Sequence, residues 1–423
     1  MPFSSLGFSP ALQPVLLRAI ADKGYLAPTA IQAQAIPAIL QGRDLIGSAQ
    51  TGSGKTAAFA LPLLHQLAME PVCKPRRVRG LVLVPTRELA VQVGEAIAGF
   101  ASYLPERLKV AVVFGGVSIN PQMMHLRGSA DIIVATPGRL LDLIDHNALT
   151  LDNIKLLVLD EADRLLDLGF GEELGRILGL LPVGRQSLLF SATFPPAIQA
   201  LATSMLKDPL RIEVVPEERG EACIRQRVIE VDAGRRTQLL RHLVQTGKYG
   251  RVLVFVATKH AAETVADKLR KSGIEAEPFH GELSQGKRMQ VLHDFKLHIV
   301  EVVVATDIAA RGIDISELPV VVNYDLPRSP VDYVHRIGRT GRAGLPGMAI
   351  SFVTATGRAH FRLIEKRQGL HLDRERVEGF EPVEVAAVNP LDSTGTGGVK
   401  GNRPSKKDKL REAARQAVVP TAL

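Results

Sequence analysis

The sequence predicts two α/β domains in tandem, each with a mainly parallel sheet flanked by helices, joined by a short linker. Short runs of Val, Leu and Ile alternate with helical patterns, and they lack the polar alternation of a half-exposed strand. Such runs are typical of parallel strands that helices cover on both faces. The series ends near Lys207 and begins again after a segment rich in Pro, Glu and Gly, which is typical of a linker. A chain of 423 residues also exceeds the size of one ordinary domain.

The composition is that of a globular protein, with 46% hydrophobic and 23% charged residues. A formal charge of +8 permits a polyanionic partner without requiring one. The two cysteines, Cys73 and Cys223, are far apart and lack metal-site spacing, so free thiols in a reducing compartment are expected. No apolar run approaches the roughly 20 residues of a membrane span, and the N-terminus lacks a basic leader region. We therefore expect a cytoplasmic protein without a membrane partner.

The first 43 residues contain a candidate for recognising a base. Thr29 follows a proline and precedes an apolar periodic run, which indicates the start of a helix. The amide of Gln32 carries both a donor and an acceptor and matches the N6/N7 edge of adenine, while Phe8 offers a ring for stacking. The alternative, a capped helix beside a buried aromatic, explains the same pattern at least as well.

The next segment, Ala49–Thr56, is Ala-Gln-Thr-Gly-Ser-Gly-Lys-Thr and predicts a phosphate-binding loop. An apolar run precedes it and a helical pattern over Ala57–Leu67 follows it, which is the order that such a loop needs. Its glycines let successive N–H groups point at phosphate oxygens, and the helix adds its positive end. Lys55 would reach the β- and γ-phosphates, and Thr56 would place its hydroxyl on Mg²⁺. Ala49 replaces the usual first glycine, so the alternative is a Gly/Ser turn with a chance lysine.

The rest of the first domain, predicted to end at residue 207, alternates strands and helices. We expect strands at Gly80–Val84, Val110–Phe114, Ile132–Ala135, Leu156–Leu159 and Ser187–Phe190. Helices are expected at Arg87–Phe100, Pro121–Leu126 and Gly138–Ile144. Polar signatures follow the strand ends, which is where parallel α/β sheets bind ligands.

One of these signatures is acidic. Asp160-Glu161-Ala162-Asp163 follows an apolar strand of the first domain. Asp160 would hold Mg²⁺, often through water, and Glu161 would orient or deprotonate the attacking water. Surface acidic runs are common, but the position after a buried strand favours a nucleotide site.

A linker is predicted at 208–222 and a second domain at 223–369. Its strands are expected at Ile224–Val231, Arg251–Val256, Ala276–Phe279, Val300–Ala305, Val320–Asn323 and Met348–Val353. Its helices are expected at Arg235–Gln245, Lys259–Lys271, Lys287–Phe295 and Val331–Ile337. This domain has no phosphate loop of its own, which suggests one nucleotide site shared by the two domains.

Three arginines lie close together near the end of the second domain. Arg336, Arg339 and Arg342 follow His335, and guanidinium groups stabilise charge that develops on a transferring phosphoryl group. They would reach a nucleotide on the first domain only if the two domains close. The alternative is a basic, solvated helix, which the small and polar residues among the arginines make less favourable.

Several small or basic residues suit contacts with a phosphodiester backbone, because glycines let N–H groups approach phosphates and hydroxyls donate to them. They are Thr86, Arg87, Gly116, Thr136 and Arg139. Each alone could equally cap a helix or form a turn. With 4% aromatic residues and no Trp, base stacking is not expected to dominate, and recognition of the backbone and its 2′-hydroxyls with little sequence preference is expected.

The pattern fades from about Leu370, and a flexible tail is expected over 370–423. The stretch Lys400–Arg411 holds six basic residues and one acidic residue, which predicts a mild affinity for polyanions. A purely solubilising tail is the alternative.

These motifs, in this order, resemble those of the DEAD-box family of ATP-dependent RNA helicases, in superfamily 2. The family is named after the tetrapeptide at Asp160–Asp163, and the resemblance covers roughly residues 3 to 369. It implies two RecA-like domains, RNA-stimulated ATP hydrolysis, and local, non-processive unwinding of RNA. Alanine is normal for the family at the position of Ala49. General likeness and the short tail favour the bacterial RhlE-type subgroup.

The resemblance also assigns roles to residues at matching positions. Segment 6–34 resembles the adenine-sensing Q motif. ATP contacts are expected from Phe8, Tyr25, Gln32, Gln50, Thr51, Gly52, Ser53, Gly54, Lys55, Thr56, Gly312 and Asp314. RNA contacts are expected from Pro85, Thr86, Arg87, Gly116, Thr136, Arg139, Gln285, Arg288 and Thr306. Coupling of ATP to RNA is expected from Asp163, Ser191, Thr193 and His335, and catalysis from Lys55, Asp160, Glu161, Arg339 and Arg342.

Two other functions fit part of the pattern. An ATP-gated RNA clamp would use the same motifs, with strand separation only incidental. A processive DNA translocase would share the fold, but the Q motif and the Asp160–Asp163 tetrapeptide oppose it. Ribosomal or RNA-decay proteins are conceivable partners.

Overall fold

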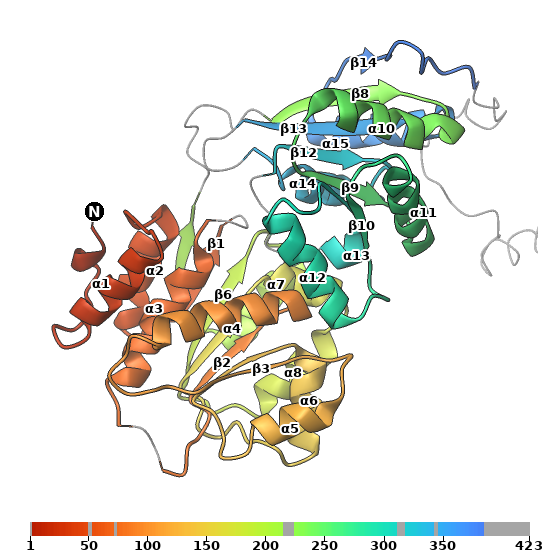
Figure 1. Cartoon of the computed structure of the whole chain (residues 1–423). Coiled ribbons are helices and arrows are strands. Elements are labelled where there is room, and N and C mark those ends of the chain that lie inside the picture. The colour runs from red at the N-terminus through yellow and green to blue at the C-terminus, as the bar shows by residue number, and fades with distance from the viewer. Residues whose placement is uncertain are drawn as a thin grey trace, which may run out of the picture.

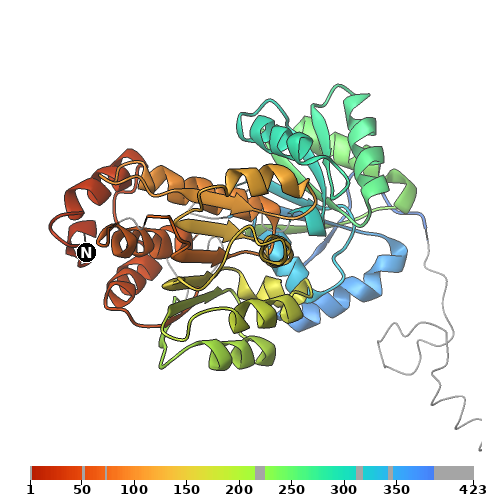
Figure 2. The same ribbon diagram turned by 90° about the horizontal axis from the view of Figure 1, so that it is seen from below.

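The computed structural model describes residues 2–49, 53–71, 74–214, 224–310, 318–341 and 346–384. These residues form two α/β domains, each built on a seven-stranded parallel sheet (Figure 1). Figure 2 shows the domains side by side, with the N-terminal helices on the side of the first domain that is remote from the second. The predicted fold class is confirmed.

The first sheet has the strand order β3-β4-β2-β5-β6-β1-β7. Its strands are β1 (Leu45–Ser48), β2 (Gly80–Leu83), β3 (Val110–Val113), β4 (Ile132–Ala135), β5 (Leu156–Leu159), β6 (Gln186–Ser191) and β7 (Leu210–Glu213). In the register, Leu45 lies between Leu188 of β6 and Leu210 of β7. The five strands between the edge strands β3 and β7 are almost entirely buried, as expected for parallel strands covered on both faces.

Helices cover both faces of this sheet. One face packs against α1 (Gln13–Asp22), α2 (Ala30–Leu40), α3 (Lys55–Ala68) and α4 (Arg87–Ala101). The other packs against α5 (Ile119–His125), α6 (Pro137–Asp145), α7 (Ala162–Asp167), α8 (Gly171–Gly179) and α9 (Pro196–Met205). A short 3₁₀ turn, η1 (Phe3–Ser5), precedes α1.

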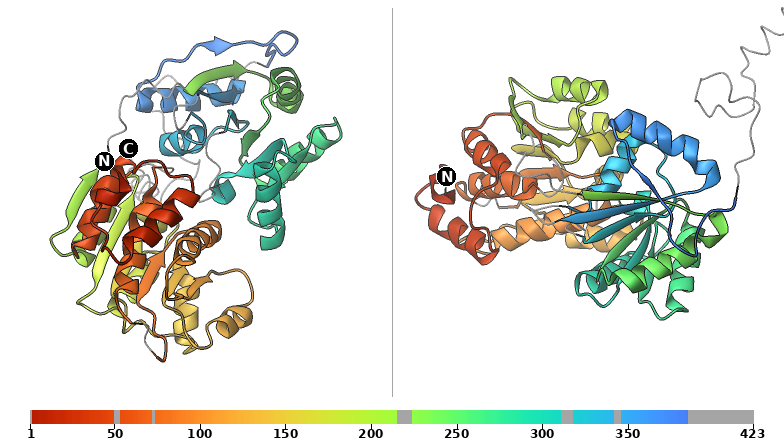
Figure 3. Two further views of the ribbon diagram at one scale, coloured as in Figure 1. Left: turned by 60° about the vertical axis from the view of Figure 1, so that its left-hand side comes forward. Right: turned by 90° about the horizontal axis from the view of Figure 1, so that it is seen from above.

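The second sheet has the order β10-β11-β9-β12-β13-β8-β14, which repeats the strand order of the first domain. Its strands are β8 (Ile224–Glu230), β9 (Val252–Val256), β10 (Ala276–Phe279), β11 (Val302–Thr306), β12 (Val320–Asn323), β13 (Gly347–Val353) and β14 (Arg374–Glu375). One face packs against α10 (Arg236–Gly247) and α11 (Lys259–Arg270). The other carries α12 (Gln285–Lys296), α13 (Asp307–Ala310), α14 (Pro330–Ile337) and α15 (Arg358–Gln368). Figure 3 shows this sheet between its two helical layers.

Two predicted boundaries need correction. The linker predicted at 208–222 contains β7, which pairs with β1 and completes the first sheet. The tail predicted at 370–423 begins with an ordered segment, because β14 pairs with β8 and the Phe380 ring lies 5.4 Å from that of His242. The second domain therefore extends to at least residue 384. Residues 215–223 and 385–423 lie outside the described part of the chain.

The carboxylate of Asp232 anchors the end of this added segment. It accepts hydrogen bonds from the backbone N–H groups of Val383 (3.1 Å) and Glu384 (2.9 Å). These bonds, first that from Glu384, lower the pKa of Asp232. The guanidinium of Arg235 lies over the Phe380 ring at 5.1 Å. The segment is thus fixed to the start of α10 by backbone, charge and ring contacts together.

Candidate active site between the two domains

The segment predicted to bind phosphate lies between β1 and α3. Gly54 precedes the helix with a φ of 89°, in the left-handed region that favours glycine. Lys55 is buried at the first position of the helix, and its Nζ donates to the carbonyl of Ala49 at 2.9 Å. The lysine thus bonds back to the residue that follows β1. Gln50, Thr51 and Gly52 lie outside the described residues.

Gln32 connects α2 to this loop. Its Oε1 accepts from the N–H of Thr29 at 3.0 Å, which caps the helix, and its Nε2 donates to the carbonyl of Gly54 at 3.1 Å. An added Cβ on Gly54 would lie 2.5 Å from that Nε2. The structure therefore contains the predicted cap and, in addition, brings the amide to the phosphate loop. One N–H and one lone pair of the amide remain for a base.

The two aromatic residues predicted to contact the nucleotide differ in their exposure to solvent. Phe8 is buried, and its ring lies 5.9 Å from that of His65 on α3. Phe8 therefore presents no open stacking face, which matches the alternative of a buried aromatic. Burial lowers the pKa of His65, in keeping with its Nε2 accepting from the N–H of Ser9 at 2.9 Å. Tyr25 is 42% exposed.

The two leading acids of the predicted tetrapeptide lie at the carboxyl end of β5. Glu161 has a φ of 51°, a strained value for a side chain with a Cβ. Its N–H donates to Oδ1 of Asp160 at 2.9 Å. Burial raises the pKa of Asp160 to about 6, against the opposing charge of Lys55. A buried carboxylate with so little counter-charge is a suitable ligand for a divalent cation.

A hydrogen-bond network links the tetrapeptide to the end of β6. Oδ2 of Asp163 accepts from the N–H of Thr193 at 3.0 Å and from its Oγ1 at 2.9 Å. Oγ of Ser191 donates to the carbonyl of Thr193 at 2.7 Å and accepts from the N–H of Asp163 at 3.3 Å. Movement of either segment would therefore be transmitted to the other. The structure brings together three of the four residues predicted to couple ATP to RNA.

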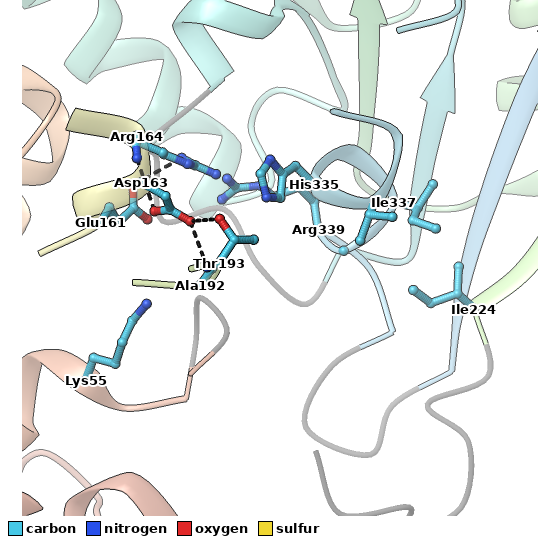
Figure 4. Close-up of a pocket in the computed structure, with 12 residues that line it drawn as sticks. Lys55, Glu161, Asp163, Arg164, Ala192, Thr193, Ile224, His335, Ile337 and Arg339 are labelled. Atoms are coloured by element: carbon cyan, nitrogen blue, oxygen red, sulfur yellow. Dashed lines mark hydrogen bonds and ion pairs between the residues drawn. The ribbon is translucent and has the colours of Figure 1, made fainter. Parts of the chain in front are cut away.

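A cavity of about 250 Å³ joins this network to the second domain (Figure 4). The first domain contributes Lys55, Glu161, Asp163, Arg164, Ala192 and Thr193, and the second contributes Ile224, Val334, His335, Ile337, Gly338 and Arg339. Burial, and next the charge of Arg164, lower the pKa of His335. The predicted phosphate-side and arginine-side residues thus line one space. Gly312, Asp314 and Arg342 lie outside the described residues.

Arg336 differs from Arg339 although both follow His335 closely. Its Nε and Nη2 donate to the two oxygens of Asp307, at 2.6 and 2.7 Å. Its Nη1 donates to Oδ1 of Asn323 at 3.1 Å and to the carbonyl of Asp325 at 2.6 Å. These bonds fix Arg336 inside the second domain, whereas Arg339 lines the cavity.

A second hollow of about 430 Å³ also spans both domains. Of the residues predicted to contact RNA, it is lined by Pro85, Thr86, Arg87, Gly116, Thr136, Arg139 and Arg288. Gly116 has a φ of 76°, and an added Cβ there would overlap the Arg87 guanidinium at 1.9 Å. The positive φ favours glycine at this position, and a Cβ there would displace the head group of Arg87. Leu168, Phe170 and Ile308 also line the hollow, and no sequence signal distinguished these apolar residues from the core.

The second domain contributes Gly281, Arg288 of α12 and Ile308 of α13 to this hollow. Arg288 forms an ion pair with Glu88 of the first domain at 3.1 Å, and its guanidinium lies 5.0 Å from the Phe279 ring centre. Both polar side-chain atoms of Gln285, one turn earlier, are buried without a hydrogen-bond partner. Thr306 ends β11 and does not line the hollow. Arg288 is thus paired with an acid of the other domain, whereas the nearby Gln285 amide has no hydrogen-bond partner.

Both domains match known protein families. Residues 29–201 match the family described as "DEAD/DEAH box helicase", and residues 235–344 match "Helicase conserved C-terminal domain". The chain is 42% identical over 372 residues to the DEAD-box ATP-dependent RNA helicase CshA of Bacillus cereus, covering 88% of this chain and 69% of that protein. The chain belongs to the DEAD-box helicase family. It is an ATP-dependent RNA helicase and therefore an ATP hydrolase that binds RNA.

Other relatives agree with this assignment. The chain is 46% identical over 333 residues to the "ATP-dependent rRNA helicase rrp3" of Sclerotinia sclerotiorum, covering 78% of this chain and 68% of that protein. Saccharomyces cerevisiae Dbp5 bound to RNA and ADP BeF3 superposes with a TM-score of 0.76 at 32% identity, covering 89% of this chain and 95% of that one. The RhlE-type placement stays a prediction. Among the described residues, no helix is long and apolar enough to cross a membrane.

Proposed function

We propose that this helicase hydrolyses ATP at the cavity between its domains and opens RNA locally rather than processively. The observation that supports this most directly is the shared lining of that cavity. Lys55 and Glu161 come from one domain, and His335 and Arg339 come from the other. A site assembled from two domains is complete only when they are held together, so hydrolysis depends on closure.

The roles in hydrolysis follow from chemistry and position. Lys55 contacts the β- and γ-phosphates in place of the Ala49 carbonyl. Glu161 orients and deprotonates the attacking water. Arg339 and Arg342 stabilise the charge that develops on the γ-phosphoryl group. Gln50, Thr51, Gly52, Ser53 and Gly54 cradle the phosphates through their backbone, and Gly312 and Asp314 complete the nucleotide site from the second domain.

The remaining nucleotide contacts involve the metal and the base. Thr56 and Asp160 fit Mg²⁺, because the Asp160 carboxylate is buried with a raised pKa. Mg²⁺, when bound, neutralises phosphate charge and the charge of this carboxylate. Gln32 uses its remaining N–H and lone pair for the adenine edge, with Tyr25 and Phe8 shaping its surroundings.

RNA binds across the second hollow. Thr86, Arg87, Gly116, Thr136 and Arg139 offer hydroxyl, guanidinium and backbone groups that suit phosphates and give little sequence preference. Gln285, Arg288 and Thr306 add contacts from the second domain, with the unsatisfied Gln285 amide ready to bond a ribose or phosphate. Closure builds this surface and the ATP site at once, so ATP and RNA favour the same state.

A biological setting can also be proposed. The name of the Sclerotinia relative, an rRNA helicase, favours ribosomal assemblies as partners, and RNA-decay proteins are the alternative. Two widely spaced cysteines are compatible with a reducing, cytoplasmic location.

A duplex-length series tests the mechanism. With stacking worth about 1.4 kcal/mol per step, a value for DNA, one closure disrupts only several pairs. Duplexes of about one helical turn should separate, and the rate should fall steeply with length. Long uninterrupted runs by single enzymes would contradict local opening. Long RNA dwell times without strand separation would instead favour the ATP-gated clamp, and equal stimulation by single-stranded DNA would contradict the preference for RNA.

A further inference from the structure

The residue directly after Arg339 is a threonine whose side chain is fully buried. The Oγ1 of Thr340 donates to the carbonyl of Leu318 and has the carbonyl of Pro319 at 3.3 Å as a second acceptor. Both carbonyls belong to the residues just before β12. One buried hydroxyl therefore ties the turn after α14, Gly338–Gly341, to the start of a central strand.

The backbone of Arg339 itself is held on three sides. Its carbonyl accepts from the N–H of Leu318 at 3.2 Å, in the direction opposite to the Thr340 hydroxyl bond, and the two segments pair as a parallel bridge. Its N–H donates to the carbonyl of Arg336 at 3.2 Å, and the N–H of Thr340 donates to the carbonyl of Ile337 at 3.1 Å. The two peptide groups that flank the Cα of Arg339 are therefore both bonded.

Two strand starts enclose the same turn. A Cβ added to Gly347, the first residue of β13, would lie 2.1 Å from Oγ1 of Thr340 and 2.2 Å from the backbone N of Gly341. A Cβ added to Gly341, whose φ is 65°, would lie 2.5 Å from Cγ1 of Ile224, the first residue of β8. The strands β12, β13 and β8 are neighbours in the sheet. The turn is thus fitted closely against three adjacent strands.

The side chain of Arg339 lines the cavity that Lys55 and Glu161 line from the first domain (Figure 4). A guanidinium stabilises a phosphoryl group in transfer only from the right distance and direction. A displacement of about 1 Å, caused by a change remote from the chemistry, can slow a reaction by about 10²-fold. The position of the Arg339 backbone should therefore affect the rate of hydrolysis directly.

We infer that Thr340 is a positioning residue for ATP hydrolysis. Its hydroxyl fixes the turn to the residues before β12 and so holds Arg339 where its guanidinium reaches the γ-phosphoryl group. Leu318, which accepts this bond, follows closely after Asp314 in the sequence. The bond therefore also links the arginine to a segment that is expected to contact the nucleotide. This inference rests on the proposed function of Arg339.

Steady-state ATPase assays at saturating RNA test the inference. Thr340→Val keeps the shape of the side chain and removes the hydroxyl, so kcat should fall about 10–100-fold. The KM for ATP and the RNA concentration for half-maximal stimulation should stay within about twofold, because Arg339 acts mainly in the transition state. Thr340→Ser keeps the donor and should retain kcat within about twofold. An unchanged kcat in Thr340→Val, or a loss confined to the KM for ATP, would overturn the inference.

Tyr333→Phe is a matched control on the same helix. The Tyr333 side chain is buried, and its hydroxyl donates to Oε1 of Gln226 at 2.8 Å. Thr340→Val and Tyr333→Phe each lose one buried hydrogen bond, so both should lower the unfolding temperature by a similar few degrees. Only Thr340→Val should lower kcat. An equal loss of kcat in Tyr333→Phe would assign the effect to general destabilisation and overturn the inference.

Gly347→Ala keeps the inference testable if Thr340→Val folds poorly. The added Cβ displaces the same turn while the Thr340 hydroxyl is retained, so kcat should again fall about 10–100-fold at an unchanged KM for ATP. A folded Gly347→Ala protein with the kcat of the parent would show that the place of the turn does not matter, and would overturn the inference.

Arg339→Ala separates this inference from the function on which it rests. Full activity of Arg339→Ala would refute the proposed role of Arg339 and the inference with it. An inactive Arg339→Ala beside a fully active Thr340→Val would refute the inference alone. In the Arg339→Ala background, Thr340→Val should cause no further loss of kcat, because Thr340 acts through Arg339. Additive losses would contradict this route of action.

Discussion

The two domains share one strand order but use the position after their first strand differently. In the first domain, β1 leads into the phosphate loop and Lys55. In the second, β8 leads into Asp232 and the 3₁₀ turn η2 (Ala233–Arg235). Asp232 points its carboxylate at the N–H groups of Val383 and Glu384. The same place in the fold is therefore proposed to hold a nucleotide in the first domain, and it holds a chain segment in the second.

The acids after the fifth strand differ in the same way. In the second domain, Asp325 accepts from Nη1 of Arg236 at 2.5 Å and from the N–H of Ala257 at 2.8 Å. In the first, Asp160 accepts from the N–H of Glu161 within the described residues, and burial raises its pKa to about 6. The fold supplies an acid at both places, but only the acid that lacks strong donors stays available to a cation.

The largest expected effect comes from the arginines of α14 and the turn after it. Arg339→Ala should keep ATP binding and lower RNA-stimulated hydrolysis by about 10³–10⁵-fold, as for an arginine finger. Arg336→Ala should instead destabilise the second domain by about 3–5 kcal/mol, because it leaves buried acceptors unpaired. Nucleotide binding, turnover and thermal unfolding of both variants provide the measurement. A stable Arg336→Ala protein would contradict the structural role of Arg336, and a fully active Arg339→Ala protein would contradict the catalytic role of Arg339.

A matched pair of substitutions tests the two acids. Asp160→Asn should lower turnover by about 10²–10³-fold through the loss of a metal ligand. Asp325→Asn should leave the chemistry in place and cost about 1.5–3 kcal/mol of stability, since a charged hydrogen bond is weakened.

The stability of Asp160→Asn should also depend on pH. A carboxyl whose pKa is raised in the folded state stabilises the fold below its unfolded pKa, and that contribution is lost as the pH rises through about 6. At neutral pH and without nucleotide, Asp160→Asn should therefore be more stable than the parent by on the order of 1–3 kcal/mol. The difference should shrink toward pH 4. Thermal unfolding at both pH values measures it, and a variant that is less stable at neutral pH would refute the argument.

The sequence predicted the domains and the main site because buried parallel strands and glycine-rich loops leave clear local patterns. It missed β7 because the strand alternates apolar and charged residues inside a segment that resembles a linker. It missed β14 because two residues carry no periodicity. It grouped Arg336 with Arg339 because only the fold shows that Asp307 holds the former. The site role of Ile308 was equally invisible, since an apolar residue in sequence indicates core.

Truncations test the corrected boundary of the second domain. A chain that ends after Glu384 should unfold at the parent temperature and keep RNA-stimulated ATPase at saturating RNA. Its RNA affinity at low salt should fall, because the basic tail contributes by counterion release. A chain that ends after Gly369 loses β14 and Phe380 and leaves Asp232 without its backbone donors, at a cost of about 2–4 kcal/mol. Equal stability of the two truncated proteins would show that the ordered segment is dispensable.

The smallest effect concerns Gln32, which links a helix cap to the predicted phosphate loop. The described residues of the second domain contain no counterpart to this link. The amide of Gln32 already serves Thr29 and Gly54, and one N–H and one lone pair remain. Adenine accepts at N7 and donates from N6, whereas guanine presents acceptors at both places. A guanine would leave the Gln32 acceptor unpaired, which costs roughly 1–3 kcal/mol. The specificity constant for ATP should therefore exceed that for GTP by about 5–150-fold.

Gln32→Glu keeps the acceptor and loses the donor, so it should weaken the bond to the Gly54 carbonyl and lower ATP affinity without reversing the preference. Equal specificity constants for ATP and GTP in the parent enzyme would show that Gln32 acts only as the cap of α2 and the brace of the phosphate loop.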